Sequence, residues 1–151
     1  MRAVVQRVSR AAVTVERVTV GEIGTGLAVL VGVTHGDTES DSVALADKLK
    51  GLRIFPDSEG RMNRSVEDVG GAILVVSQFT LFGDARKGRR PSFVDAADPE
   101  VAEPLITTVV DRISDSGIPT ATGRFGARME VTIVNDGPVT MVLEVVDGRL
   151  V

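Results

Sequence analysis

The 151-residue sequence contains no cysteine and only one histidine, His35. The absence of cysteine excludes disulfides, cysteine-ligated zinc and a thiol nucleophile. A single histidine without cysteine is also too little for a typical transition-metal site, so we expect no metal and no other cofactor. His35 lies in the polar segment VTHGD, where a lone histidine is more often a solvated loop residue than a general base.

Tyrosine and tryptophan are absent, phenylalanine occurs five times, and long apolar runs are missing. The core must therefore consist of Val, Ile, Leu and Ala, a composition that favours strands. The longest apolar run, near residues 73–76, is too short to span a bilayer, and MRAVVQRVSR lacks the apolar stretch of a signal peptide. We therefore expect a cytoplasmic protein that does not bind a membrane.

The remaining composition is that of an ordinary globular domain. The hydrophobic fraction is 43% and the charged fraction 25%, and the length predicts a single domain over residues 1–151 with a sizeable core. No repeat or low-complexity linker divides the chain. The net charge of −4 argues mildly against a partner that is bound mainly through its phosphates.

Apolar patterns predict more strands than helices. The expected strands are residues 2–8, 11–15, 18–23, 27–33, 53–55, 72–79, 129–134 and 139–146. One helix begins at Thr38, in the capping-box-like T-E-S-D, and ends near Gly51. A second begins at Asp98-Pro99-Glu100, becomes regular a turn later because of Pro104, and ends before Gly117.

The order of these elements favours an α+β fold, because strands and helices do not alternate strictly. We expect a curved, barrel-like sheet, mostly antiparallel or mixed, packed against two main helices. Three acidic residues surround the start of the first helix: Asp37, Glu39 and Asp41. They could hold Mg²⁺, but a helix N-terminus attracts acidic side chains in any case, and we assign them to capping.

The segment NDGPVT, residues 135–140, separates the last two expected strands. Asp136-Gly137 is a strong pair for a two-residue hairpin turn, but Pro138 then removes a backbone donor that a paired strand would use. The residues alone favour a trans Gly137–Pro138 bond, since only about 5–6% of X-Pro bonds in folded proteins are cis. The segment is either an irregular turn or a place where an unusual Gly-Pro bond meets something else.

Polar groups end the strand expected at residues 72–79. Ser77, Gln78 and Thr80 need partners if they are buried, which favours a site, whereas Gln78 and Thr80 could equally face solvent. The following loop has a local charge of +3, from Asp84 and four cations: Arg86, Lys87, Arg89 and Arg90. Such runs are usually solvated, but in an acidic protein this is the natural surface for contacting phosphates. Because this loop has no aromatic residues on which bases could stack, it would contact a nucleic-acid backbone or an end and would not distinguish bases.

SQFTLFGD together with NDGPVT closely resembles the two signature segments of the D-aminoacyl-tRNA deacylases. The similarity runs from AVVQRVSRAAVTV through GEIGTGLAVLVGV, RIFPDSEGRMN and RRPSF to TGRFGARMEV, and so covers nearly the whole chain. The resemblance implies a cytoplasmic homodimer that hydrolyses the ester joining a D-amino acid to the 3′ end of tRNA. It also implies that glycine attached to the wrong tRNA is a substrate, because glycine has no side chain.

The resemblance further implies roles for particular residues. The Gly137–Pro138 bond would be cis, braced by Arg7, and would reach from one subunit into the pocket of the other to exclude L-amino acids sterically. The matching strand end would line the pocket: Ser77, Gln78, Phe79 and Thr80. Because no histidine lies near Thr80 in the sequence, we expect attack by water, with backbone N–H groups near Phe79 and Thr80 as oxyanion donors and assistance from the tRNA 2′-hydroxyl.

Two alternatives stay open. A different hydrolase would use Ser77 or Thr80 as the nucleophile and His35 as its base. A non-enzymatic tRNA-binding module would use the loop of residues 86–90 and would bind tRNA whether or not an amino acid is attached.

Overall fold

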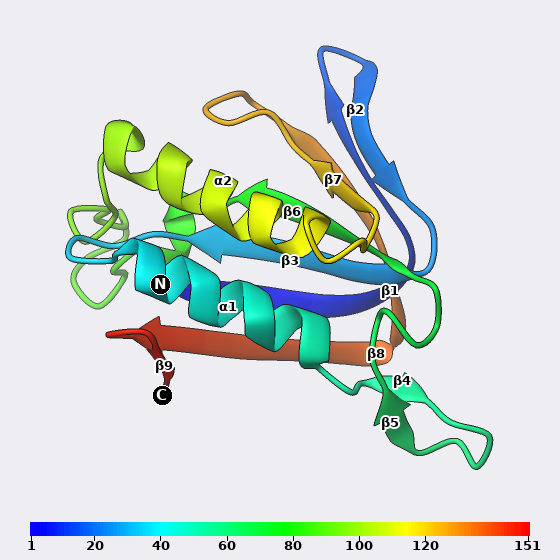
Figure 1. The fold of residues 1–151 in the computed structure, drawn as a ribbon. Coiled ribbons are helices and arrows are strands. Elements are labelled where there is room, and N and C mark those ends of the chain that lie inside the picture. Colours follow the sequence, from blue (N-terminus) through cyan, green and yellow to red (C-terminus); the bar gives the residue numbers. More distant parts are fainter.

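The computed structural model describes residues 1–151. Seven strands form its main sheet: β1 (Arg2–Val15), β2 (Val18–Ile23), β3 (Gly26–Gly32), β6 (Ala72–Ser77), β7 (Thr120–Thr122), β8 (Glu130–Val146) and β9 (Arg149–Leu150). Two helices, α1 (Glu39–Gly51) and α2 (Pro99–Ser114), lie side by side on one face of this sheet (Figure 1). A small hairpin, β4 (Phe55–Pro56) and β5 (Met62–Arg64), projects from the body, and a 3-10 turn, η1 (Phe79–Phe82), follows β6.

The main sheet is mixed and curved. Its strand order is β7-β6-β3-β1-β8-β9, with β2 paired to β1. β6 is parallel to β3 and β7, whereas β1 is antiparallel to β2, β3 and β8. The first half of β1 pairs with β3 and its second half with β2, so the sheet curls over along β1 (Figure 1). The expected α+β fold, a half-barrel of strands with two helices, is confirmed.

Alternating strand side chains form two hydrophobic clusters. The larger joins the sheet to both helices and includes Val5, Val29, Ile73, Leu45, Leu49 and Val109. The second is made by strands alone and includes Val13, Ala28, Leu74 and Val76. Ala28 and Val29 are neighbours in β3 but belong to different clusters, because successive side chains of a strand point to opposite faces. Burial on both faces explains why β3 and β6 are nearly continuous apolar runs.

The segment NDGPVT does not form the expected hairpin turn. Residues 130–146 are a single strand, β8, and both of its halves pair with β1. Between the pairs Val8↔Asn135 and Gln6↔Thr140, β8 advances by five residues while β1 advances by two, so the middle of the segment bulges out of the ladder. Of the two alternatives for this segment, the irregular turn is wrong, because the long β1 pairs with both flanking segments, which turn propensity cannot reveal.

Other element boundaries also differ from the prediction, and the strand expected at 53–55 is found at Phe55–Pro56. β1 does not break near Ser9-Arg10; its register against β8 shifts there instead. α2 is regular from Pro99 onward, because Pro104 lies on the exposed side and leaves only the Glu100 carbonyl without its helical partner. The strand expected at 72–79 ends at Ser77, where the chain turns toward η1.

Asp41 ties the start of α1 to the turn between β8 and β9. Its side chain is buried and accepts hydrogen bonds from the backbone N–H groups of Thr38 (2.8 Å) and Gly148 (2.9 Å). Burial by itself raises the pKa of this carboxyl, but the hydrogen bonds from Gly148 and Thr38 outweigh burial and hold the pKa below its usual value. The predicted helix start at Thr38, with Asp41 in the place of the usual Glu, is confirmed.

We expect Asp41→Asn to lower the free energy of unfolding at neutral pH by about 1–3 kcal/mol. Because the folded-state pKa is depressed, ionised Asp41 contributes stability above the unfolded-state pKa of about 3.9, and this contribution is lost as the pH falls through the folded-state value. Urea unfolding at a series of pH values between about 7 and 3 measures both effects. The wild type should lose stability more steeply than the variant on acidification, and parallel curves would contradict the assignment.

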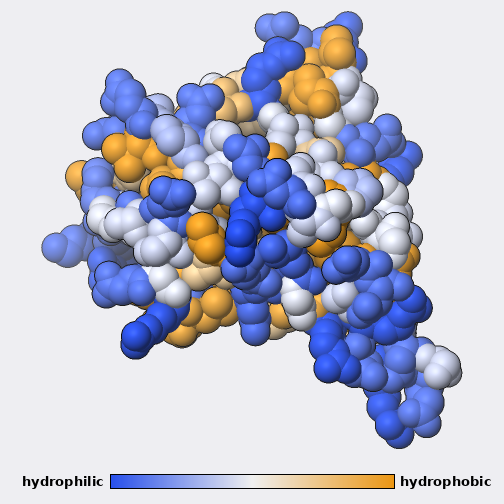
Figure 2. Space-filling view, viewed as in Figure 1, coloured by the Kyte–Doolittle hydropathy of each residue, from blue (hydrophilic) through white to orange (hydrophobic).

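The surface over the two helices is mostly hydrophilic. Figure 2 shows only small, separate apolar patches on this face, and the projecting β4–β5 hairpin is also mostly hydrophilic. No helix is both long and apolar enough to cross a membrane. Several of the larger exposed apolar side chains lie instead on the strands: Val18, Val134, Val142 and Val146.

Candidate active site

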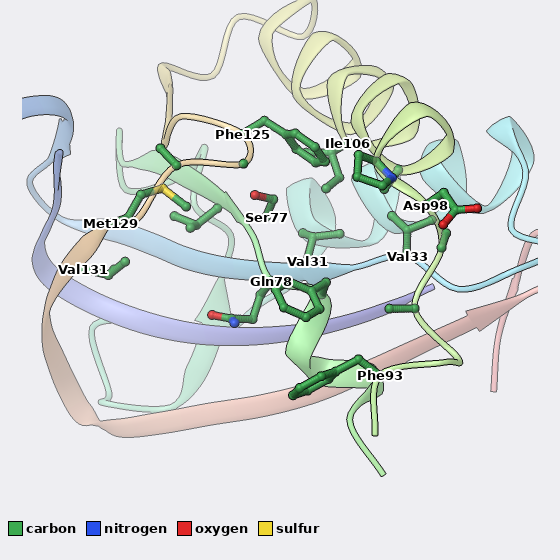
Figure 3. Close-up of a pocket in the computed structure, with 18 residues that line it drawn as sticks. Val31, Val33, Ser77, Gln78, Phe93, Asp98, Ile106, Phe125, Met129 and Val131 are labelled. Atoms are coloured by element: carbon green, nitrogen blue, oxygen red, sulfur yellow. The ribbon is translucent and has the colours of Figure 1, made fainter. Parts of the chain in front are cut away.

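A pocket of about 560 Å³ opens where β6 ends. Its walls come from the ends of β3 and β6, the start of α2, and the loop of residues 123–129 that leads from β7 into β8. Figure 3 shows side chains from these separate elements, including Val31, Ile106 and Phe125, gathered around this space. Because most of the lining is apolar, the pocket suits a ligand with substantial apolar surface and a few polar groups.

The strand end expected to form the site does border this pocket. Ser77, Gln78 and Phe79 line it, whereas Thr80 does not. The backbone N–H of Gln78 donates to the carbonyl of Val31 (2.7 Å), and its side-chain amide donates to the hydroxyl of Thr80. Thr80 is exposed and this amide is the only partner of its hydroxyl, so nothing beside it could act as the base that a threonine nucleophile requires.

The first N–H groups of η1 are free to donate to a ligand. The leading N–H groups of a 3-10 turn have no partner inside the turn. Those of Phe79 and Thr80 also have no acceptor among the turn and loop hydrogen bonds. Because Phe79 lines the pocket, these donors lie at its edge, where they can meet a developing oxyanion.

Two phenylalanines form one lip of the pocket. Phe79 is 58% exposed and Phe93 37% exposed, and their rings meet edge to face with centroids 5.1 Å apart. Phe93 follows a loop that is closed by two backbone hydrogen bonds between Asp84 and Ser92, of 2.7 and 2.8 Å. Aromatic rings that stay exposed at a pocket lip provide a contact surface for a ligand.

The Gly137–Pro138 bond is cis, as the family resemblance implies. Arg7 lies against the bulge that contains this bond and is only 8% exposed. Its Nη1 donates to the carbonyl of Ile54 (2.6 Å), and its Nε donates to the carbonyl of Asp136 (3.3 Å) and lies 3.1 Å from the Asp136 carboxylate. The guanidinium therefore links the bulge to the segment before β4.

Asn135 closes the bulge from the other side. Its side-chain amide donates to the carbonyls of Arg7 (2.9 Å) and Val139 (3.0 Å), which holds the two ends of the bulge together. Asn135 is a site residue that is absent from the prediction, although it stands at the head of NDGPVT. Held by Asn135 and Arg7, Gly137 and Pro138 remain exposed to solvent.

The bulge does not reach the pocket of its own chain. None of Arg7, Gly137 and Pro138 is among the residues that line the pocket. A single chain therefore brings together only part of the expected site, with the strand end at the pocket and the Gly-Pro bulge elsewhere on β8.

A family model described as D-Tyr-tRNA(Tyr) deacylase matches residues 4–144 of the chain. The chain belongs to this family. A protein of Halalkalibacterium halodurans named D-aminoacyl-tRNA deacylase is 58% identical over 144 residues, which cover 95% of this chain and 99% of that relative. A protein of Desulforudis audaxviator with the same name is 60% identical over 144 residues, which cover 95% and 97%.

Solved structures show the same fold. A protein described as c-Myc DNA unwinding element binding protein superposes with a TM-score of 0.89 at 40% identity, covering 96% of this chain and 99% of the other. A probable eukaryotic D-amino acid tRNA deacylase superposes with a TM-score of 0.76 at 20% identity, covering 93% and 97%, and at that identity the likeness concerns the fold alone. The family resemblance carried by SQFTLFGD and NDGPVT is thus confirmed.

The cationic loop of this deacylase-family chain is only partly neutralised. Arg86 forms a two-pronged ion pair with Asp84, and hydrogen bonds from the Arg86 side chain and backbone lower the pKa of Asp84 to about 2. Lys87, Arg89 and Arg90 form no ion pair and are exposed. Three cations therefore remain free on the loop that leads to Phe93 at the pocket lip.

His35 is not placed to act on the strand end. It is exposed, its Nε2 lies 2.9 Å from the carbonyl oxygen of Val94, and it does not line the pocket. This is the arrangement of a loop residue that stabilises a neighbouring loop.

Among the pocket residues that are absent from the predicted site are three with large side chains: Phe93, Phe125 and Met129. They belong to RRPSF and TGRFGARMEV, segments that contribute to the family resemblance. In the second segment, partly buried Phe125 and Met129 alternate with exposed Arg124 and Arg128. This alternation is the signal that could have marked the loop as a wall with one apolar side.

Proposed function

We propose that this protein hydrolyses D-aminoacyl-tRNA, and glycyl-tRNA formed in error, to free amino acid and tRNA. Its family membership makes it a hydrolase of aminoacyl-tRNA esters. Water adds to the ester carbonyl, the bond from that carbon to the ribose oxygen breaks, and the ribose oxygen takes up a proton. The observation that carries the proposal is the pocket at the end of β6, where Ser77, Gln78 and Phe79 present polar groups beside an apolar chamber.

The proposed chemistry relies on backbone groups. The free N–H groups of Phe79 and Thr80 would stabilise the oxyanion formed when water attacks, and preorganised donors of this kind supply much of the acceleration in acyl transfer. No histidine or carboxylate is paired with Ser77 or Thr80 as a base. The 2′-hydroxyl of the terminal adenosine would assist proton transfer, so neither metal nor cofactor is invoked.

The apolar chamber would hold the invariant part of the substrate. An enzyme that accepts many D-amino acids cannot use a pocket shaped for one side chain, whereas the terminal adenosine is common to every tRNA. Phe125 and Met129 provide flat and adaptable apolar contacts for a nucleobase. The apolar chamber is therefore assigned to the nucleoside. Discrimination between D- and L-amino acids is assigned to the groups around the α-carbon of the substrate.

Selection against L-amino acids is assigned to the Gly137–Pro138 bulge of a second copy. The bulge is exposed, lies outside the pocket of its own chain, and is held by Arg7 and Asn135. A rigid backbone placed where an L side chain would point excludes it sterically, and such repulsion can discriminate more strongly than added attraction.

The sheet offers a face on which the second copy would pack. Val142, Val4 and Leu30 stand opposite one another on three adjacent strands, and Leu30 is paired in turn with Val76, which lines the pocket. Val142 is 67% exposed. This apolar row, Val142–Val4–Leu30, connects the strand that carries the bulge with the pocket edge. In a twofold symmetric dimer each surface would meet its own copy, which would bring each bulge toward the other pocket.

The rest of the tRNA would be held electrostatically. Lys87, Arg89 and Arg90 are free cations beside the pocket lip and would contact phosphates, adding affinity without base selectivity. Residues 1–151 would act as a single deacylase domain in the cytoplasm, where aminoacyl-tRNA is used.

The decisive experiment is single-turnover hydrolysis of tRNA charged with D-tyrosine, L-tyrosine or, on its own tRNA, glycine. We expect rapid loss of the D-ester and the glycyl ester while the L-ester persists. Equal hydrolysis rates for the D-tyrosyl and L-tyrosyl esters would indicate an unselective esterase. No hydrolysis by a folded sample, with tRNA binding indifferent to charging, would favour the non-enzymatic binding module.

Thr80→Ala is expected to keep the rate within about tenfold of the wild type, because the backbone N–H of residue 80 remains and the hydroxyl is not activated. If Thr80 were the nucleophile, its replacement would instead lower the rate by several orders of magnitude. Single-turnover hydrolysis of D-tyrosyl-tRNA makes the comparison. His35→Ala serves as the companion variant, since it would abolish activity only in the alternative hydrolase where His35 is the base.

A further inference from the structure

A second hollow of about 300 Å³ adjoins the pocket, between α2 and the end of β7. Ser77, Ile106 and Phe125 line both spaces, so the two adjoin at these side chains. Figure 3 shows the three side chains close together at one end of the pocket. The hollow is therefore the next space that a chain bound in the pocket would meet along α2.

The second hollow is more polar than the pocket. Glu103 and Thr107 face it from successive turns of α2, and Thr122 faces it from β7. The Glu103 carboxylate forms no ion pair, whereas the Thr107 hydroxyl donates to the Glu103 carbonyl (2.9 Å). A hollow lined by one unpaired carboxylate and by Phe125 suits a planar group that carries an amino donor.

An exposed cation belongs to the segment that lines this hollow, although it is not itself part of the lining. Arg124 is exposed and forms no ion pair, and its neighbours Gly123 and Phe125 both line the hollow. The Glu103 carboxylate inside the hollow can accept a hydrogen bond from a base. The Arg124 guanidinium outside it can contact the negatively charged phosphate of the same nucleotide.

We infer that this second hollow binds the penultimate nucleotide of the tRNA 3′ end, and this inference rests on the proposed deacylase function. The terminal adenosine occupies the pocket, and the preceding cytidine follows it across Phe125. Cytosine stacks on the Phe125 ring, its N4 amino group donates to Glu103, and Arg124 contacts its phosphate. The site therefore senses the base before the terminal adenosine.

The test compares single-turnover hydrolysis of chemically prepared D-tyrosyl esters of a tRNA ending in C-C-A and the same tRNA ending in C-U-A. Uracil places a carbonyl where cytosine has its amino group, so the wild type should prefer C-C-A by about tenfold. Glu103→Ala should reduce this preference to less than about twofold. Glu100→Ala is the matched control, since Glu100 is an exposed residue of the same helix that lines neither space.

A third substrate, the D-tyrosyl ester of adenosine alone, separates the subsite from the reaction centre. Wild type and Glu103→Ala should hydrolyse it equally, because it has no penultimate nucleotide. Arg124→Gln should slow both tRNA substrates alike, keep the C-C-A preference, and reduce the dependence of log rate on log salt by about 0.7.

Each outcome bears on a distinct claim. Equal wild-type rates on C-C-A and C-U-A would overturn the subsite while leaving the deacylase function intact. If Glu103→Ala slowed hydrolysis of the adenosine ester as much as hydrolysis of the C-C-A tRNA ester, Glu103 would belong to the reaction centre. That result would also overturn the subsite. Absence of hydrolysis of every D-ester by the folded wild type would mean that the proposed function itself has failed.

Discussion

Replacing Gly137 with alanine is expected to slow single-turnover hydrolysis of D-aminoacyl-tRNA by about 100-fold or more, because a shift of about 1 Å in a positioning group can cost that much. Gly137 has φ +124°, a conformation that L-residues rarely adopt. A Cβ there would lie 2.9 Å from Val139 Cγ2 and 3.0 Å from Arg7 Nη2. The Arg7 side chain is buried and donates a hydrogen bond to the carbonyl of Ile54. The bulge, or the Arg7 and Val139 side chains that pack against it, must therefore shift.

Gly60→Ala is the matched control for this substitution. Gly60 also has a positive φ, +78°, but a Cβ at that position would meet nothing within 4 Å. Both variants should lose about 1–3 kcal/mol of stability through backbone strain. Gly137→Ala should lose more because of its Cβ contacts, so hydrolysis is compared on folded samples of both. A Gly137→Ala protein with normal rate and normal rejection of the L-ester would exclude the bulge from substrate selection.

Val142→Asp is expected to convert the protein to monomers and to abolish hydrolysis of D-aminoacyl-tRNA. The variant places a carboxylate in the row Val142–Val4–Leu30, where dimer formation would bury it without a partner at a cost of several kcal/mol. Since Val142 is 67% exposed in the single chain, folding itself should be little affected. Analytical ultracentrifugation and single-turnover hydrolysis on the same sample test both consequences.

Val18→Asp provides the comparison, because Val18 is similarly exposed, at 62%, but lies in β2, outside this row. It should remain dimeric and active. A Val142→Asp protein that is monomeric yet fully active would show that the pocket needs no second chain. One that remains dimeric would show that the subunits meet through another face.

These two substitutions test opposite ends of the same proposed arrangement. Gly137 belongs to the bulge that would enter the partner's pocket, and Val142 belongs to the surface that would hold the partners together. Both lie on β8, which is paired with β1 along nearly its whole length. A single long strand would thus set the distance between the dimer contact and the selecting group.

Local patterns in the sequence predicted the parts of the fold that depend on neighbours along the chain. The start of α1 at Thr38, the hairpin arm at residues 18–23 and the apolar central strand β3 all follow from capping, turn and burial patterns a few residues long. The segments SQFTLFGD and NDGPVT were also sufficient to identify the family. Such features can be predicted because the residues that determine them are close together in the sequence.

The final conformation of those segments depends on residues that are distant in the chain. NDGPVT has the sequence of a hairpin turn, yet it is a bulge in β8 because β1, more than a hundred residues earlier, pairs with both of its sides. Likewise, Phe93, Phe125 and Met129 meet Ser77 in one pocket only because the curled sheet and α2 bring two distant loops to the end of β6. The family and the local elements follow from short stretches of residues. The register of long-range strand pairing decided which residues share a pocket, since pairing energy depends on partners that no local pattern specifies.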